Sequence, residues 1–320
     1  MALGTNHIIT GEVPNFIPEL WSDEVIAAYK SNLVMGQLVR KLSHRGKKGD
    51  TIKVPTPARA DASDKSVSAQ AQVTLIQHGT DAGLSILINK HKEYSRLIED
   101  IVDVQSLASL RSFYTDDGGY AISKAVDQDI WVELFNTGSA SLTHTASTHT
   151  LTTASTFDTI LEGDGTAWDE TTATDISDVG IRTMVKSLDD SDTPMGGRVL
   201  AIPTIVKFDL LGLNRFTEQA FVGEVGGGNS IRNGLVGDVY GVDVYVTTNS
   251  PLVEDSGGTA DNIAGAMFHA DGLALVEQLG VRSQTQYKQE YLADLFTVDM
   301  IYGVKALRDS SIVTFVVPTT

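Results

Sequence analysis

The sequence contains no cysteine, so disulfide bonds, thiolate metal sites and cysteine nucleophiles are excluded. No apolar run approaches the roughly 18–20 residues that a helix needs to span a bilayer, and no membrane partner is expected. The first residues, MALGTNHIITGEVPNF, lack a basic stretch followed by an apolar core. We therefore expect no signal peptide and synthesis in the cytoplasm.

Catalytic and metal-binding motifs are also missing. There is no G-x-S-x-G and no H-E-x-x-H, and no grouping of nucleophile, base and orienting residue stands out. His144 and His149 lack further ligands at zinc-site spacing, which favours two solvated histidines. Asp189, Asp190 and Asp192 resemble the start of a calcium loop, but the glycine is misplaced, so a turn is favoured. We expect no enzyme activity, no metal and no cofactor.

Positive charge is scarce and unevenly placed. The chain has 24 Lys and Arg against 41 Asp and Glu, a formal net charge of −17, yet residues 1–100 hold 12 cations and 11 acids. The densest cationic run is RKLSHRGKKGD at 40–50, with Arg40, Lys41, Arg45, Lys47 and Lys48. No aromatic residue lies between positions 40 and 61, so base stacking is unsupported. This favours ion pairs with acidic protein surfaces over nucleic-acid binding.

The first 92 residues read as two arms joined by a helix. Residues 1–21 contain two prolines and the apolar Phe16 and Trp21, which suits an arm lying on another surface. A helix is expected after Ser22, ended or loosened by Gly36, with one face formed by Ile26, Tyr29 and Leu33. β-rich segments at 51–54, 73–77 and 84–89 then predict a long β-arm, along which lie the cations Lys53, Arg59 and Lys65. A two-stranded arm is marginal alone, so we expect it to lie on a neighbour.

The rest of the chain predicts a mixed α+β fold. A helix is expected over 93–136, interrupted by DDGG at 116–119. The Thr/Ser-rich residues 137–159 predict either an exposed β-hairpin or a flexible insertion, followed by an acidic irregular segment to 175. Helices are then expected at 176–188, 204–211, 271–277 and 292–298, and strands at 199–202, 239–247, 264–268 and 281–288, with a closing strand pair at 301–307 and 312–317.

The stretch GEVGGGNSIRNG at 223–234 is the best candidate for a phosphate loop. It lacks the Gly-Lys-Ser/Thr ending of a Walker loop, and no clear helix follows it. A flexible loop is the favoured interpretation, with its distinctive residues at Gly226, Gly227, Gly228 and Arg232.

Several phrases, taken in order, resemble one family. These are IPELWSDEVIAAYKSNLVMGQLVRKL followed by KKGDTIKVP, then YAISKAVDQDIW, GLVGDVYGVDVYVTTNSP, AGAMFHADGLALVEQ and YGVKALRDSSIVTFVVP. Together they resemble the major capsid protein of tailed bacteriophages, with the Hong Kong 97-type fold. The resemblance implies the following parts: an N-terminal arm and helix (1–45), an extended β-loop or E-loop (46–92), a peripheral domain with the spine helix (93–136), a Thr/Ser-rich and acidic insertion (137–175), an axial domain (176–262), and a return with closing strands (263–320).

The resemblance also implies a function and partners. Such a subunit would self-assemble as pentamers and hexamers into the icosahedral head shell that encloses double-stranded DNA without reading its sequence. It would be found in the virion, after assembly in the host cytoplasm with a scaffolding protein and a portal, and with decoration or cement proteins as further candidates. The expected subunit contacts are the cations of residues 40–65 together with Phe16 and Trp21.

Three other functions remain open at this point. An encapsulin-like cellular nanocompartment shell would share the fold but enclose a protein cargo. An enzyme would use the glycine-rich loop at 223–234. A surface-layer or fibre protein would draw on the Thr/Ser-rich segment, although the expected lack of a secretion signal argues against it.

Overall fold

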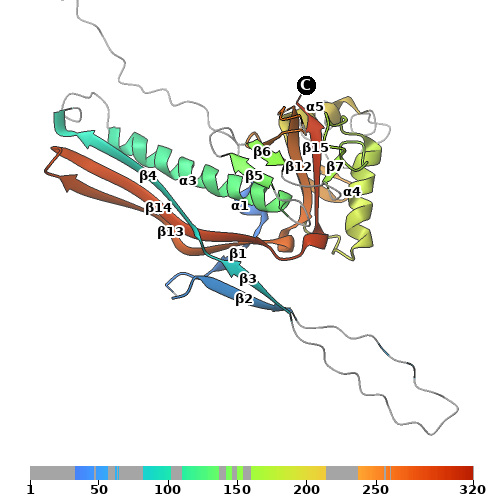
Figure 1. Ribbon diagram of the computed structural model, residues 1–320, viewed down its shortest axis with the longest axis horizontal. Coiled ribbons are helices and arrows are strands. Elements are labelled where there is room, and N and C mark those ends of the chain that lie inside the picture. The colour runs from blue at the N-terminus through green and yellow to red at the C-terminus, as the bar shows by residue number, and fades with distance from the viewer. Residues whose placement is uncertain are drawn as a thin grey trace, which may run out of the picture.

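The computed structural model describes most of the chain after residue 32. The described residues are 33–46, 48–56, 62, 64, 82–101, 110–136, 142–145, 150–153, 160–213, 237–255, 257–259 and 261–319. They form two large sheets, one long helix and a projecting two-stranded hairpin (Figure 1). None of the helices among them combines the length and apolar character needed to cross a membrane.

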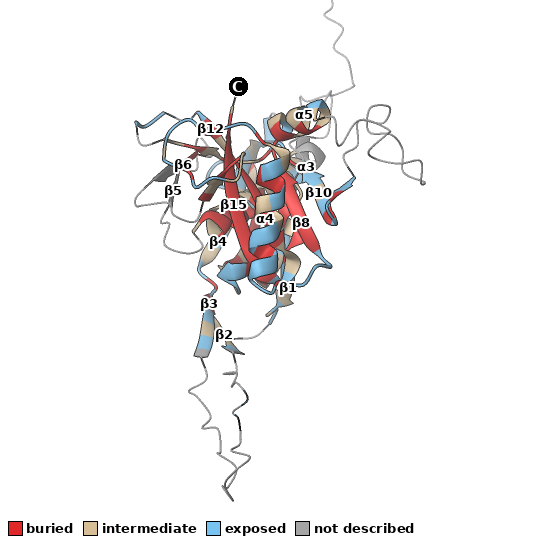
Figure 2. Cartoon of the chain, turned by 90° about the vertical axis from the view of Figure 1, so that its right-hand side faces the viewer, coloured by how far each residue is buried: buried red, intermediate tan, exposed pale blue. Residues whose placement is uncertain are grey.

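A nine-stranded sheet forms the thickest part of the molecule. Its strands are β5 (Leu142–Thr145), β6 (Thr150–Thr153), β7 (Ile160–Glu162), β8 (Arg198–Ile202), β9 (Asp238–Val239), β10 (Val242–Val246), β11 (Leu252–Val253), β12 (Asn262–His269) and β15 (Ile312–Pro318). The order is β5-β6-β11-β12-β8-β10-β9, while β15 pairs with β12 and β7. All seven residues of β15 are buried, as Figure 2 shows for its centre. Strands buried on both faces are continuously apolar.

Each face of this sheet is covered by helix. Val313 and Phe315 of β15 pack with α4 (Asp178–Asp190) and α5 (Thr204–Gly212) on one face. Ile312 and Val316 join the larger core, which includes the end of α3 (Leu110–Phe135). Helix α4 has a clear local start signal, because Ser177 caps it by accepting a hydrogen bond from the Gly180 N–H.

A four-stranded sheet extends away from this body, in the order β1-β13-β14-β4. Its strands are β1 (Arg40–Ser43), β4 (Lys90–Glu99), β13 (Leu273–Lys288) and β14 (Ala293–Ala306). Helix α3 runs along the long strands, and Figure 1 shows it on one side of them. At 1.5 Å per residue its 26 residues span about 39 Å. The face that α3 buries is a ridge of Ile122, Val126, Ile130 and Leu134, which are all at most 7% exposed.

A separate hairpin projects from the root of the long sheet. Strands β2 (Thr51–Thr56) and β3 (Ala82–Leu87) pair antiparallel and, among the described strands, only with each other. They point away from the buried body (Figure 2). The single-turn helix α1 (Met35–Leu38) precedes β1. Gly36 therefore lies inside a helical turn instead of ending one. The strand predicted at 73–77 lies outside the described residues.

The sequence-based elements between 176 and 268 are confirmed as α4, β8, α5, the β9–β10 pair and β12. Residues 142–145 and 150–153 form the predicted hairpin, but its second strand also joins β11, and Leu151 is fully buried. The sheet thus buries part of a segment that was expected to be exposed.

Four expectations were wrong. Residues 93–99 are strand, paired residue by residue with β14. The helices expected at 271–277 and 292–298 are largely strand, because β13 and β14 pair over most of their length. The strands at 301–307 and 312–317 exist but do not pair with each other. The DDGG stretch does not interrupt α3, and a Cβ at Gly118 would lie 3.0 Å from Tyr94 and from Val298, so the glycine lets β4 and β14 approach the helix.

Candidate assembly surfaces at the root of the hairpin

The basic run begins as an edge strand of the four-stranded sheet. Arg40 to Ser43 form β1, which pairs parallel with β13 in the register Arg40–Ala274 to Ser43–Glu277. The backbone of residues 40–43 is therefore held by its own subunit along one edge, while the outer edge of β1 has no partner strand among the described residues.

Two of the predicted contact cations already have acidic partners in the same chain. Arg45 Nη2 lies 2.7 Å from the Glu277 carboxylate, and Arg40 Nη1 lies 3.5 Å from Asp271. The Arg45 guanidinium also covers Gly280, where a Cβ would come within 2.7 Å of Nη2. The Arg45 side chain therefore ties the run to β13, and its predicted contact with a neighbouring copy stays a prediction.

Three other cations of the predicted set are exposed. Lys41, Lys48 and Lys53 lie in or beside β1 and β2, and none has a carboxylate within 4 Å among the described residues. These three lysines, on β1, on β2 and in the connection between them, are referred to below as the basic surface at the base of the hairpin. The other predicted site residues fall outside the described residues: the contact residues Phe16, Trp21, Lys47, Arg59 and Lys65, and the glycine-rich-loop residues Gly226, Gly227, Gly228 and Arg232.

The root of the hairpin is packed firmly on the long sheet. Ile86 and Ile88 are buried against Ala274 and Val276 of β13, forming a small core of their own. The Ile88 N–H donates to the Asp50 carbonyl at 2.8 Å, which closes the hairpin at its base. We infer that the hairpin leaves the subunit in a set direction, since its base is held by apolar contacts and hydrogen bonds.

A glycine permits this close packing. The backbone of Leu87 lies directly on Gly303 of β14, and a Cβ at position 303 would overlap the Leu87 carbonyl oxygen. Because the obstructing atom belongs to the backbone, no side-chain rotation relieves the clash. Gly303 therefore determines how near the hairpin lies to β14, whereas Gly83, within β3, has open space around its Cβ direction.

Buried polar contacts join α3 to the long strands. The Tyr302 hydroxyl donates to Asp129 at 2.5 Å, and Lys90 and Lys92 approach the same carboxylate at 3.1 and 3.3 Å. Burial, reinforced by the Asp129 charge, raises the pKa of Tyr302 far above its ordinary value, so this hydroxyl stays protonated and remains a donor. Glu133, one turn further along α3, accepts from Lys305 at 2.9 Å.

Asp127 plays a similar part at the other edge of α3. Its carboxylate accepts from the Met35 N–H at 2.8 Å and from Asn249 Nδ2 at 2.9 Å, which joins α1, α3 and the segment after β10. Burial raises the pKa of Asp127, and these hydrogen bonds oppose the rise. In the sequence, Asp127 and Asp129 stand next to Val126 and Ile130 of the buried ridge of α3. This position is the one local signal that could have identified them as buried polar residues. Their partners are up to 173 residues away.

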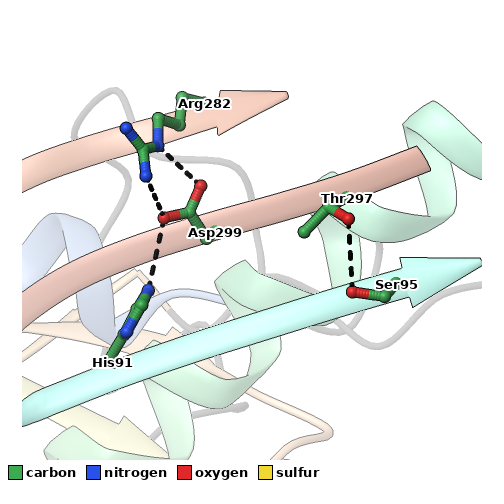
Figure 3. A network of polar contacts seen from close by, with 5 residues as sticks. All are labelled: His91, Ser95, Arg282, Thr297 and Asp299. Atoms are coloured by element: carbon green, nitrogen blue, oxygen red, sulfur yellow. Dashed lines mark hydrogen bonds and ion pairs between the residues drawn. The ribbon is translucent and has the colours of Figure 1, made fainter. Parts of the chain in front are cut away.

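The opposite face of the long sheet carries a smaller polar network. Figure 3 shows Asp299 of β14 between Arg282 of β13 and His91 of β4. The guanidinium of Arg282 donates to both carboxylate oxygens at 2.7 and 2.9 Å, and His91 Nε2 lies 3.2 Å away. These hydrogen bonds, that of Arg282 above all, lower the pKa of Asp299. Since Lys90 and Lys92 contact α3, alternation along β4 turns His91 to the face without a helix.

The polar contacts described above link elements of the same subunit to one another. They contain no group of three or more His, Cys, Asp or Glu placed to hold a metal ion. The carboxylates that lie near cations, such as Asp129 and Asp299, are saturated by those cations and by hydroxyl or imidazole donors. Features that the described residues leave open to other molecules include the projecting hairpin, the basic surface at its base and the uncovered sheet face.

Comparison with known proteins gives a match at the level of structure. No protein-family model and no curated protein matches the chain. A solved structure from Mycobacterium phage Che8 is 23% identical, with a TM-score of 0.69 over 94% of this chain and 97% of that one. The capsid of cyanophage P-SCSP1u is 18% identical, with a TM-score of 0.71 over 96% and 95%. The capsid of Ralstonia phage GP4 is 14% identical, with a TM-score of 0.70 over 99% of both chains.

These matches cover nearly the whole length of this chain and of each matched chain, so they compare complete folds and not a shared fragment. They include structures of assembled phage capsids. The mixed α+β arrangement, with a long helix along a long sheet and a projecting hairpin, is therefore the Hong Kong 97-type fold of tailed-phage major capsid proteins, as the resemblance in the sequence predicted.

Proposed function

We propose that this protein is the major capsid protein of a tailed phage, a non-enzymatic subunit that self-assembles into an icosahedral shell around double-stranded DNA. The observation that carries the proposal is the near-complete structural match to phage capsid structures. The domain boundaries implied by the resemblance form part of the proposal. Within it, β2–β3 belongs to the E-loop (46–92) and α3 is the spine helix of the peripheral domain.

The projecting hairpin supports an assembly role. A two-stranded hairpin is marginal in water unless a further surface covers it. Its root is fixed on β13 and β14, so its direction is set before any partner is met. An arm of this kind gives a large contact area for few residues, which suits a subunit that must bury surface against several copies. Lys41, Lys48 and Lys53 at its base would meet the acidic surfaces of neighbouring copies.

The charge distribution supports the proposed DNA-filled shell. Residues 101–320 hold 30 Asp and Glu against 12 Lys and Arg. A strongly acidic body repels polyanions, so a shell lined by it would not hold the genome by phosphate contacts. The proposed partners are copies of this chain, a scaffolding protein, a portal and possible cement proteins, and the proposed site is the virion after assembly in the host cytoplasm.

Electron microscopy of the purified protein tests the proposal. The protein should be expressed alone and with candidate scaffolding proteins, imaged in negative stain and assayed for nucleic acid and co-purifying protein. We expect closed shells of uniform size. Shells from infected cells that carry double-stranded DNA support the capsid function, whereas shells that carry a protein cargo and no DNA indicate a nanocompartment. A monomer that never assembles under any condition contradicts both.

A further inference from the structure

A groove lies between α1, α3 and β13, on the side of the long sheet where the chain enters the described structure. Its volume is about 310 Å³. The apolar part of its lining is formed by Leu33, Ile122, Val126, Leu275, Val281 and Met300. Val281 is 54% exposed, which is high for an apolar strand residue beside such a lining.

The chain itself leads into this groove. Leu33 is the first described residue and lines it. The next two residues are anchored, because Val34 packs on the main core and Met35 is fully buried, with its N–H on Asp127. The residues immediately before Leu33 must therefore start at the groove wall. The 32 residues that precede Leu33 supply ample chain to fill it.

The sequence pattern before Leu33 matches the groove. Ile26, Tyr29 and Leu33 share one face at helical spacing. With a rise of 1.5 Å per residue, Tyr29 would follow Leu33 at about 6 Å and Ile26 at about 10 Å along the helix axis. The side chains that come next on the face of Leu33 are thus a large aromatic and a branched aliphatic residue, which suit an apolar lining.

We propose that residues 23–32 of the same chain occupy this groove, with Tyr29 and Ile26 against Val281 and Met300. The polar rim suits tyrosine, since Gln37 and Glu277 offer partners for its hydroxyl while the ring is buried. The segment fixes where the N-terminal arm leaves the subunit. The inference concerns the single subunit and holds whether or not shells form.

Site-directed cross-linking tests this directly, because the chain has no cysteine of its own. Tyr29→Cys is combined with Val281→Cys in the full-length subunit and treated with a mild oxidant or a short bismaleimide. A disulfide needs Cα atoms within about 7 Å, and the bismaleimide covers longer separations. We expect a cross-link within one chain, seen as a faster monomer band and confirmed by mass spectrometry. Tyr29→Cys with Tyr245→Cys, on the far sheet, serves as the matched control and should remain uncross-linked.

Two results overturn the proposal. Cross-linked dimers mean that a second copy supplies the occupant, and no cross-link with either reagent means that residues 23–32 lie elsewhere. A second variant gives an independent reading: Val281→Asp places a charge on an exposed wall of the groove that the fold tolerates. Amide exchange over residues 26–33 should then be at least about tenfold faster, the change that corresponds to about 1.4 kcal/mol, with α4 unchanged. Exchange equal to wild type over residues 26–33 contradicts the proposal.

Discussion

The nine-stranded sheet is covered on both faces, whereas the four-stranded sheet is covered by a helix on one face only. In the first, β15 is buried along all seven residues, with α4 and α5 on one face and the α3 side on the other. In the second, β13 is buried from Leu273 to Val276, but residues 281–287 are exposed. The first sheet satisfies its strands within one chain. The second is covered by α3 on one face only and carries the hairpin at its root.

The difference separates a region that is stabilised by its own chain from a region that has surface left for assembly. A sheet with both faces covered gains its stability from apolar burial and needs no partner. A sheet with one open face and a hairpin of two strands has contact area left to bury. Variants in the two regions should therefore separate stability from assembly, and they are ordered below by their expected effect on the free energy of unfolding.

The largest effect is expected in the nine-stranded sheet. A Cβ at Gly265 of β12 would overlap the Phe315 ring in the pairing strand. Gly265→Ala should cost about 3 kcal/mol or more, because both groups are fixed inside a close-packed core. Urea unfolding followed by circular dichroism measures this. Gly196→Ala, at an exposed turn with open space, should unfold as wild type does; equal stability of the two variants would show that the β12–β15 contact is looser than described.

A smaller and more local effect is expected at the hairpin root. Gly303→Ala forces the Leu87 backbone away from β14, and we expect a cost of about 1–3 kcal/mol. Limited proteolysis should cleave the hairpin faster, and shell formation should fail while the nine-stranded sheet stays folded. Gly83→Ala, within β3, has room for its methyl group and is the control. Normal assembly of Gly303→Ala would mean that the direction of the hairpin does not matter.

The next effect concerns the buried contacts below α3. Tyr302→Phe removes the hydroxyl that donates to Asp129 and leaves that carboxylate to Lys90 and Lys92. The loss should be about 1–2 kcal/mol, because a buried acceptor loses a donor. Tyr287→Phe also removes a hydroxyl bonded to an aspartate, Asp100, but at an exposed position, and should leave stability unchanged. Equal values for both variants would mean that burial of the hydroxyl does not determine its contribution to stability.

On the open face, a pH dependence is expected. The pKa of Asp299 is lowered by Arg282 and His91, so its ionised form contributes stability above the ordinary aspartate pKa of about 4. That contribution is lost as pH falls through the lowered pKa. Asp299→Asn should therefore lose less stability than wild type between pH 5 and pH 2. Parallel curves of unfolding free energy against pH would exclude this role for the network in Figure 3.

The smallest effect on stability, and a large one on assembly, is expected at the basic surface. Lys47→Glu with Lys48→Glu should leave unfolding unchanged and prevent shell assembly or maturation. Lys48 is exposed and has no acidic partner among the described residues, whereas Arg45 has Glu277. Arg182→Glu with Lys186→Glu on α4 is the control of equal charge change. Normal shells that fail only to retain DNA would instead support a nucleic-acid role for the run.

The correctly predicted elements are those whose signals are local. Helix α4 has its Ser177 cap and an apolar face, and β8 is a short apolar run before a helix. The elements predicted wrongly depend on distant partners. Residues 93–99 and 292–298 contain good helix formers, yet they pair with each other across about 200 residues, and that pairing overrides local propensity. DDGG stays helical because Gly118 fits under Tyr94 and Val298.

The candidate surfaces were only partly accessible from the sequence for the same reason. Charge density located the basic run, but nothing local indicated that Glu277 would take up Arg45 from 232 residues away. The fixed root of the hairpin depends on Gly303, whose neighbour Leu87 is equally remote. Order and composition predicted the architecture, whereas the pairing of particular charges required the structure.

Hydrogen exchange on the free subunit and on assembled shells compares the two regions most directly. We predict that assembly slows exchange in β2, β3 and residues 281–288 of β13, while β12 and β15 exchange equally slowly in both states. Shells in which the hairpin exchanges as fast as in the free subunit, or in which β12 and β15 gain most of the protection, would contradict the division between a self-sufficient body and a surface completed by other copies.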